Sequence, residues 1–243
     1  MRIAIIGCGW VGERLAKYLT GKNYHVIATT TSPEKIIALE KVATEVHLLD
    51  FNSTIDFGFL DHVNVAIFSM PISRNGWHQG FEKLDQQFPK TILFSSTGIY
   101  PQEDKIFTEN DTDHLRTDIL ASENLVRQKY PQTNILRFGG LMGDERLLKN
   151  MFKNRQPENP SKPTNYIHYE DILPIVELVL HSEIKSETYN IVAPKHPSIA
   201  EVLNLESQTS DDNKTETKQR IISSEHLIQD FNYTFIHPNP TYF

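Results

Sequence analysis

The sequence predicts an α/β fold in which helices cover both faces of a parallel sheet. Short apolar and β-branched runs alternate with helix-like stretches, and such alternation implies crossover connections between parallel strands. Several runs are apolar on both faces, for example Val65–Phe68 and Thr91–Phe94, as expected of strands covered on both sides. A glycine-rich turn at Gly7–Gly12 directly follows the first run. Together these observations predict a doubly wound parallel sheet.

The strands are predicted at residues 2–6, 24–30, 45–49, 63–69, 91–95 and 134–138. The helix after the first strand has one apolar face, formed by Val11, Leu15, Tyr18 and Leu19, and Gly21 is placed to cap its C-terminus. The next helix is expected to begin at Ser32-Pro33-Glu34, because serine is a good N-cap and proline suits the first helical position.

After residue 138 the alternation weakens and prolines gather between residues 157 and 163. We therefore expect residues 1–138 to form a nucleotide-binding core and residues 139–243 to form a small C-terminal substrate-side region packed on the same domain. The stretch 207–220 is rich in Ser, Thr, Asp and Lys, which is typical of a solvated loop.

Composition excludes some classes of function. A chain of 243 residues with 39% hydrophobic residues can bury one substantial core. The net charge of -7 offers no basic surface for nucleic acid or for an anionic membrane. No apolar run approaches the roughly 18 residues of a membrane span, and no signal peptide is recognisable. The single cysteine, Cys8, cannot form an internal disulfide and favours a cytoplasmic location.

The turn Gly7-Cys8-Gly9-Trp10-Val11-Gly12 follows a strand and opens a helix, which is the context of a Rossmann-type dinucleotide site. In such a turn the first glycine permits the tight bend, the second lets the backbone approach a pyrophosphate, and the third allows close packing of helix on strand. The helix N-terminus supplies N–H groups to the phosphates and could lower the pKa of Cys8. The alternative is a glycine-rich turn without a ligand.

The choice between NADP and NAD is expected to depend on the end of the second strand. An acidic residue that would bind the ribose 2'-hydroxyl of NAD is missing there. The hydroxyls of Thr30, Thr31 and Ser32, together with Lys35, could instead receive the 2'-phosphate of NADP. The alternative is that these hydroxyls only end a strand and cap a helix. Asp50 could lie beside the adenine or simply form a turn before Phe51.

Several later segments resemble one family in the same order. They are Phe94–Tyr100, Ser122–Val126, Ile135–Gly143, Asn165–Ile172 and Tyr189–Val192. This order resembles the extended short-chain dehydrogenase/reductases, the NAD-dependent epimerase/dehydratase family. The resemblance covers nearly the whole chain and implies a Rossmann fold, a nicotinamide cofactor and a small hydroxyl- or carbonyl-bearing substrate.

In that family a tyrosine and a lysine four residues later handle the proton and the nicotinamide ribose, and a serine or threonine contacts the substrate oxygen. Counting back from Glu123, the tyrosine and lysine positions fall on Leu115 and Ile119, and residues 101–129 contain no tyrosine. The chain therefore resembles the atypical members of the superfamily, which lack this pair. The N-terminus alone also resembles 6-phosphogluconate dehydrogenase-type reductases, but their large helical domain has no counterpart here.

Three residues are candidates for catalysis. Ser96, with Thr97 beside it, occupies the hydroxyl position at the end of the fifth strand, although such residues are often only turn or cap residues. His114 borders the vacant tyrosine position, and histidine is a residue type that suits acid–base work, although a surface histidine is the plainer interpretation. His168 and Asp171 are expected to anchor the substrate-side loop.

The ten histidines show no local ligand spacing, so no metal site is predicted. Residues 74–78 are interpreted as a mobile cover over the nicotinamide or as an ordinary surface loop.

The sequence thus predicts an NAD(P)-binding protein that acts as an oxidoreductase or epimerase/dehydratase-like enzyme with a non-standard active site. The alternative is an inactive NAD(P)-binding sensor or partner subunit. The expected partners are a nicotinamide dinucleotide and an unknown small molecule, with no nucleic acid and no membrane, in a monomer or a homodimer.

Overall fold

The computed structural model describes residues 1–205 and 219–243. Contacts divide the chain into two compact units. The first comprises Met1–Ser96, Arg116–Leu136 and Val176–Thr188, and the second comprises Thr97–Leu115, Arg137–Ile175 and Tyr189–Phe243. The predicted solvated loop at 207–220 lies outside the described residues except for Gln219 and Arg220. The division into a nucleotide-binding core, residues 1–138, and a substrate-side region, residues 139–243, stays a prediction.

The main sheet has seven strands in the order β10-β7-β5-β4-β1-β2-β3. The strands are β1 (Arg2–Ile6), β2 (His25–Thr30), β3 (Glu45–Leu48), β4 (Val65–Phe68), β5 (Lys90–Ser96), β7 (Asn134–Phe138) and β10 (Thr188–Ile191). β1 pairs in parallel with both β2 and β4, so that Ile3 stands between Val26 and Val65. All six predicted strands are confirmed to within two residues at each end, and β10 overlaps Tyr189–Val192, one of the segments that carry the family resemblance.

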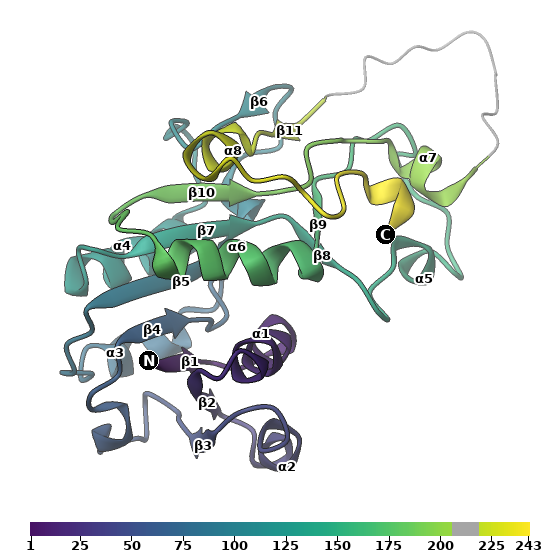
Figure 1. The fold of residues 1–243 in the computed structure, drawn as a ribbon. Helices are drawn as coiled ribbons and strands as arrows, with labels where there is room; N and C mark the ends of the chain where they lie inside the picture. The colour runs from purple at the N-terminus through teal and green to yellow at the C-terminus, as the bar shows by residue number, and fades with distance from the viewer. Residues whose placement is uncertain (206–218) are drawn as a thin grey trace, which may run out of the picture. The chain divides into compact units, whose positions relative to one another are not determined.

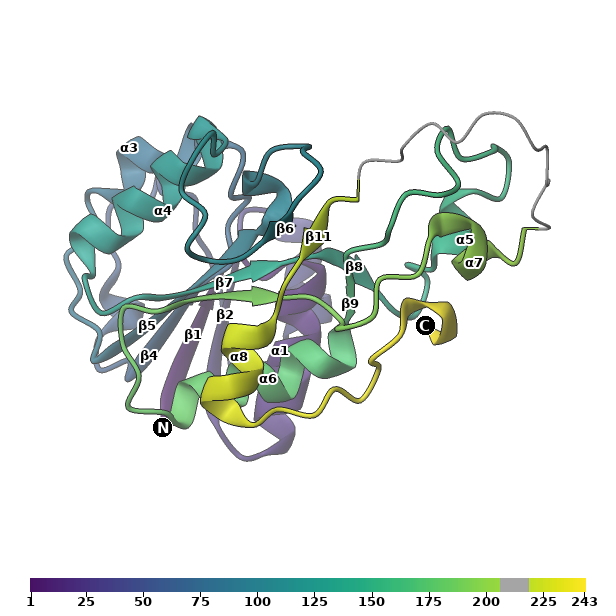
Figure 2. The same ribbon diagram turned by 90° about the horizontal axis from the view of Figure 1, so that it is seen from above.

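Helices cover both faces of the strands in the first unit, as predicted. They are α1 (Trp10–Gly21), α2 (Ile36–Leu39), α3 (His78–Phe81) and α4 (Thr117–Lys129). Figure 2 shows α3 and α4 on one side of these strands and α1 on the other. The packing follows from the two-residue period of β1, in which Ile3 and Ile5 face α1 while Ala4 and Ile6 face the opposite side.

The end of α1 differs from the prediction. Gly21 is the last helical residue rather than the cap, and Asn23 takes the left-handed conformation with φ of 63°. Asparagine tolerates this conformation because its short polar side chain can hydrogen-bond locally. The second helical segment begins at Pro33 as predicted, first as a 3-10 turn over Pro33–Lys35 and then as α2. Ser32 occupies the N-cap position of that turn without a side-chain capping hydrogen bond.

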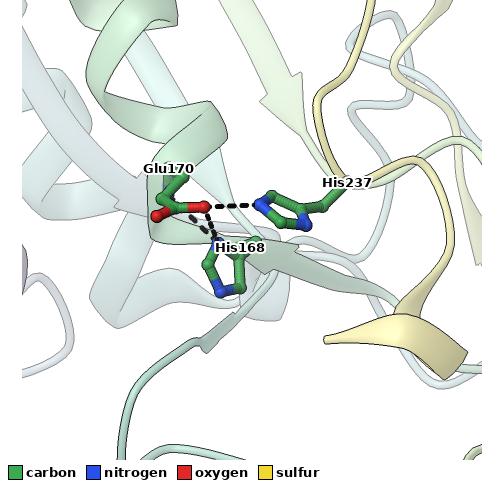
Figure 3. Close-up of side chains that lie close together, drawn as sticks. All are labelled: His168, Glu170 and His237. Carbon is green, nitrogen blue, oxygen red and sulfur yellow. Dashed lines mark hydrogen bonds and ion pairs between the residues drawn. The ribbon is translucent and has the colours of Figure 1, made fainter.

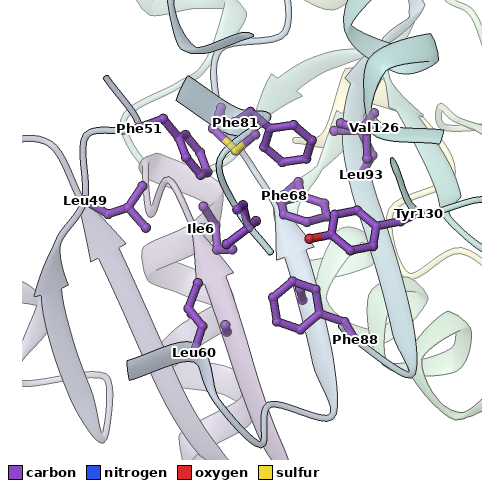
Figure 4. Close-up of a cluster of buried hydrophobic side chains, with 14 of the residues drawn as sticks. Ile6, Leu49, Phe51, Leu60, Phe68, Phe81, Phe88, Leu93, Val126 and Tyr130 are labelled. Carbon is purple, nitrogen blue, oxygen red and sulfur yellow. The ribbon is translucent and has the colours of Figure 1, made fainter. Parts of the chain in front are cut away.

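An aromatic core lies under α3 and α4. Phe68, fully buried on β4, makes an edge contact with Phe81 at 5.3 Å between ring centroids and stacks on Tyr130 at 5.5 Å. Figure 4 shows these rings with Ile6 and Val126 in one cluster. This core includes Ala4 and Ile6 and so packs on the face of β1 opposite α1, up to the residue that precedes the glycine turn.

The second unit contains two small parallel pairs of strands. β6 (Ile106–Phe107) pairs with β11 (Ile221–Ile222), and β8 (Gly140–Met142) pairs with β9 (Tyr166–His168). Its helices are α5 (Leu148–Met151), the first half of α6 (Tyr169–His181), α7 (Ile199–Leu203) and α8 (Glu225–Phe231). No helix within residues 1–205 or 219–243 is long and apolar enough to cross a membrane.

Asp171 is a buried hydrogen-bond anchor, as predicted, but its partners belong to the segment after α8, and no comparable bonds to the described residues are seen for His168. Its carboxylate is fully buried in the first turn of α6 and accepts hydrogen bonds from the Tyr233 hydroxyl and from the backbone amides of Ile236 and His237, at 2.7–2.9 Å. A buried carboxylate needs such donors. The segment that follows α8 is thereby fastened to the start of α6.

Candidate functional site

The glycine turn bends sharply where β1 ends. Gly7 has φ of 87°, and a Cβ at this position would lie 3.1 Å from backbone atoms of Ser69 and Met70. Only glycine adopts such a conformation without cost. The Gly7 amide donates to Thr29 Oγ1 at 3.0 Å, and the Cys8 amide donates to the Thr29 carbonyl at 2.7 Å. Thr29, on β2, therefore holds the turn in place, a role that the sequence analysis did not assign.

Gly9 and Gly12 have different surroundings. A Cβ on Gly9, the N-cap of α1, would meet no protein atom within 4 Å. A Cβ on Gly12 would lie 3.1 Å from Cys8 Sγ and 3.3 Å from Ile5 Cγ2. Gly12 thus permits close packing of α1 on β1, whereas Gly9 leaves open space at the N-terminus of α1. This is the division of roles expected of a turn that admits a pyrophosphate.

A cavity of about 230 Å³ opens beside this turn, wholly within the first unit. It is lined by eight of the residues predicted to bind cofactor: Gly7, Cys8, Gly9, Thr30, Thr31, Ser32, Lys35 and Asp50. Trp10, Val11 and Gly12 form the first turn of α1 instead, where amide groups have no acceptor inside the helix. The amides and the positive end of the helix dipole favour an anion at this position.

The end of β2 offers hydroxyls and one cation to the cavity. Thr30 is buried and its Oγ1 accepts a hydrogen bond from the Ser32 amide at 3.1 Å, while Thr31 and Lys35 are exposed. The absent capping bond leaves the Ser32 hydroxyl uncommitted to the helix that follows. No carboxylate lies between residues 28 and 33.

Asp50 forms the turn considered for it, and its place beside the adenine stays a prediction. Its Oδ1 accepts the Asn52 amide at 3.0 Å, which forms a tight turn after β3, and the residue is exposed and lines the cavity. A carboxylate in a turn keeps lone pairs for a ligand.

Cys8 corrects one expectation. Burial, followed by the negative charge of Glu13, raises the pKa of the thiol to about 12, although the helix N-terminus was expected to lower it. The loss of hydration outweighs the helix dipole at this depth. Cys8 is therefore a protonated packing residue at neutral pH.

The segment at 74–78 is fastened to the first unit rather than loose. Asn75–Trp77 forms a 3-10 turn that continues into α3, and Trp77 is buried, lines the cavity and donates from Nε1 to the Pro71 carbonyl at 3.2 Å. His78 Nε2 lies 2.8 Å from Ser122 Oγ on α4, and the Ser122 hydroxyl lies 2.8 Å from the Ile72 carbonyl. Burial lowers the pKa of His78.

The catalytic candidates lie at three different kinds of position. Ser96 is the half-buried last residue of β5, in the first unit. Thr97 belongs to the second unit, where it is buried and donates to the Phe138 carbonyl at 3.3 Å. His114, also in the second unit, is exposed in a turn with φ of 54°. Their roles stay predictions.

The vacant catalytic positions carry apolar side chains. α4 begins at Thr117, so Leu115 precedes the helix, while Ile119 is buried within it. At Arg116, the N-cap, the guanidinium forms an exposed ion pair with Asp118. Position 119 packs into the core and cannot bind a ribose hydroxyl.

One buried polar pair was missed by the sequence analysis. Ser95 Oγ on β5 donates to Glu123 Oε1 on α4 at 2.6 Å, and both residues are nearly inaccessible. Because side chains alternate along a strand, Ser96 faces the opposite side of β5. Arg14 was also missed: its guanidinium lies 3.8 Å from the centroid of the Trp10 ring. Neither contact can be recognised from the local sequence, because a single Glu or Arg in a helix is usually exposed to solvent.

Comparison with known proteins agrees with this geometry. A family model described as NADP oxidoreductase, coenzyme F420-dependent, matches residues 2–73, which hold the glycine turn. Over 98% of its length the chain is 23% identical to the protein YeeZ of Escherichia coli, of which it covers 97%.

Solved structures show the same fold. One is a conserved protein of unknown function from Silicibacter pomeroyi, with a TM-score of 0.77, 14% identity and coverage of 99% of this chain and 95% of that one. Another is the UDP-glucuronic acid 4-epimerase of Bacillus cereus in complex with NAD, with a TM-score of 0.76, 15% identity and coverage of 99% and 93%. The resemblance expected from the sequence, to epimerase/dehydratase-type dehydrogenases, is confirmed at the level of the fold.

Proposed function

We propose that this chain binds a nicotinamide dinucleotide, NADP in preference to NAD, in the cavity beside the glycine turn. The observation that carries the proposal is the contrast between two glycines. Gly7 is required by the backbone, with φ of 87°, whereas the missing side chain of Gly9 leaves open space directly at the N-terminus of α1. The packing around position 9 does not require a glycine, whereas the close approach of a pyrophosphate does.

The residues present fit such a group. The first amides of α1 would bind the pyrophosphate, and Asp50, at the end of β3, would lie on the adenosine side of the cavity. Thr30, Thr31 and Ser32 would donate to a 2'-phosphate, and Lys35 would supply a positive charge to it. Residues 28–33, at the end of β2, contain no carboxylate that would repel that phosphate.

We further propose that the protein is an oxidoreductase or epimerase/dehydratase-like enzyme that acts on a small hydroxyl- or carbonyl-bearing substrate. The bound dinucleotide would supply hydride transfer. Ser96 would hydrogen-bond the reacting oxygen from the end of β5, with Thr97 and His114 as further candidates for contact and proton transfer. The apolar Leu115 and Ile119 exclude the usual tyrosine and lysine, so proton handling differs from that of the standard enzymes.

Calorimetric titration with NADPH and NADH tests the cofactor. We expect NADPH to bind more tightly than NADH, and Gly9→Val to abolish binding because its side chain would fill the space of the pyrophosphate. Gly21→Val is the matched control, since Gly21 also has open space around its Cβ position but lies outside the cavity. Absence of binding to folded wild-type protein would refute the proposal, and equal effects of both substitutions would refute the assigned site.

A substrate screen tests catalysis. We expect stereospecific transfer of deuteride from labelled NADPH to a carbonyl compound, and a lower kcat in Ser96→Ala than in Ser161→Ala, an exposed control. Tight binding without turnover over a broad panel would instead support the sensor or partner-subunit role. We also propose a cytoplasmic location, on the basis of the single thiol. Light scattering would measure whether the protein is a monomer or a homodimer.

A further inference from the structure

The second unit brings two histidines and a glutamate together from distant parts of the chain. His168 ends β9, Glu170 lies in the first turn of α6, and His237 follows α8. His168 Nδ1 lies 3.7 Å from Glu170 Oε2, and His237 Nε2 lies 2.6 Å from the same oxygen. The two imidazole centroids are 4.0 Å apart. Figure 3 shows both rings turned toward the Glu170 carboxylate, and one donor atom from each of the three residues lies within 4.8 Å of the other two.

This convergence is built into the fold. His237 and Glu170 are 67 residues apart in sequence, and the backbone next to both is held by one buried group. The Asp171 carboxylate, adjacent to Glu170, accepts the backbone amide of His237 at 2.9 Å and that of Ile236 at 2.7 Å. The position of His237 relative to the start of α6 therefore does not depend on the exposed side chain of Glu170.

The cluster has a closed side and an open side. The side chain of His168 is 10% exposed, that of His237 25% and that of Glu170 47%. The Tyr169 ring stacks on His168 at 4.9 Å, and the Phe243 ring makes an edge contact with His168 at 5.5 Å. Aromatic packing limits the movement of the imidazoles, while the exposed carboxylate leaves a path from solvent to the donor atoms.

From this geometry we propose that His168, Glu170 and His237 bind a divalent transition-metal ion, with Zn²⁺ as the best match. Two imidazoles and one carboxylate are a donor set that zinc accepts, with one position left for water. Magnesium and calcium are bound by several oxygen ligands, and this cluster offers a single carboxylate. The ion would join the end of β9 and the first turn of α6 to the segment after α8.

The distances suit such an ion after a small adjustment. Ligand atoms about 2.0–2.2 Å from a tetrahedral zinc lie roughly 3.3 Å from one another. The observed separations from Glu170 Oε2, 3.7 Å and 2.6 Å, lie on either side of that value. Rotation of the exposed Glu170 side chain can change both without moving the backbone. The amide of Glu170 donates to His168 Nδ1 at 3.3 Å, a long hydrogen bond that costs little to exchange for a metal ligand.

The hydrogen bond between His237 and Glu170 also changes on binding. With the imidazole proton on Nε2, His237 would donate to the Glu170 carboxylate across the observed 2.6 Å contact, whereas a metal needs the Nε2 lone pair. A shift of the imidazole proton from Nε2 to Nδ1 would free that lone pair without net proton release. Without a metal the cluster would be an ordinary hydrogen-bonded pair beside a third polar group, and this is the alternative that the experiment must exclude.

The test is calorimetric titration of the untagged, chelator-treated full chain with Zn²⁺. We expect one ion per chain, visible d–d absorption bands when Co²⁺ is used instead, and no binding of Mg²⁺. Glu170→Gln and His237→Ala should each weaken Zn²⁺ binding by at least about 100-fold, because loss of a ligand costs more than loss of its supporting hydrogen bond. Zn²⁺ should raise the Tm of the wild type and leave that of both variants unchanged.

Matched controls separate ligation from surface charge. Glu225→Gln removes an exposed glutamate from the first turn of α8, and His62→Asn removes an exposed histidine, and both should bind Zn²⁺ as the wild type does. If the wild type takes up less than one ion per chain, or if Glu170→Gln binds as tightly as Glu225→Gln, the proposal is wrong. Because Glu170 is exposed, we expect Glu170→Gln to fold. Its Zn²⁺ affinity therefore tests the proposal even if His237→Ala fails to fold.

Discussion

Replacing each glycine of the turn by alanine should separate folding from ligand binding. Gly7→Ala places a side chain in the left-handed region and brings its Cβ to 3.1 Å from the backbone of Ser69 and Met70. The conformation costs about 1–2 kcal/mol, and the close contact adds about 1–2 kcal/mol more. Gly9→Ala meets no atom within 4 Å, and only the weaker N-cap preference of alanine acts against it, at about 0.5–1 kcal/mol.

Thermal unfolding without ligand measures this difference. At roughly 2–4 °C per kcal/mol for a chain of this size, Gly7→Ala should lower the Tm by about 4–16 °C and Gly9→Ala by at most about 4 °C. At 100 times its Kd, NADPH should stabilise the wild type by about 2.7 kcal/mol, and this gain should be lost in Gly9→Val. If Gly9→Ala unfolds as early as Gly7→Ala, Gly9 serves the fold and the argument for a pyrophosphate fails.

Three further predictions concern the core, the cofactor and pH. Phe68→Ala, at a fully buried ring, should cost about 3–5 kcal/mol in chemical unfolding, whereas Ile55→Ala, at a residue 94% exposed, should cost almost nothing; similar losses would contradict the assigned core. Lys35→Glu should weaken NADPH binding about 10- to 100-fold through reversed charge and leave NADH binding nearly unchanged; an equal loss for both would place Lys35 away from a 2'-phosphate. Burial lowers the pKa of His78 below 6.5, so the unfolded chain takes up its proton first and stability should fall as pH drops below 6.5. His78→Gln should flatten that part of the Tm profile, and an unchanged slope would show that His78 titrates normally.

The strands were predictable because their signal is local. Apolar runs such as Val65–Phe68 can be buried on both faces only inside a covered sheet, and short connections then leave few arrangements. The glycine turn is equally local, since the strand, the bend and the helix start lie within twelve residues of Met1. Eight of the predicted cofactor residues share one cavity because parallel strands bring their carboxyl ends to the same edge of the sheet.

Predictions from the local sequence failed where the outcome depends on the depth of burial or on a residue distant in the sequence. The pKa of Cys8 depends on how completely the turn is covered, and a glycine motif carries no measure of burial. Trp77 looked like part of a surface segment, yet it is buried and lines the cavity. Asn23 rather than Gly21 ends the first helix in the left-handed conformation, because either residue suits that role and packing selects between them.

The sequence by itself determined the alternation of strands and helices, the glycine turn and the loss of the tyrosine and lysine at Leu115 and Ile119. Only the tertiary structure placed Glu123 against Ser95 and His237 against Glu170. Hydrogen-bonded neighbours 28 and 67 residues apart leave no periodic signal in a single chain. Such pairs form because burial of polar groups demands partners, and the fold alone decides which partners are within reach.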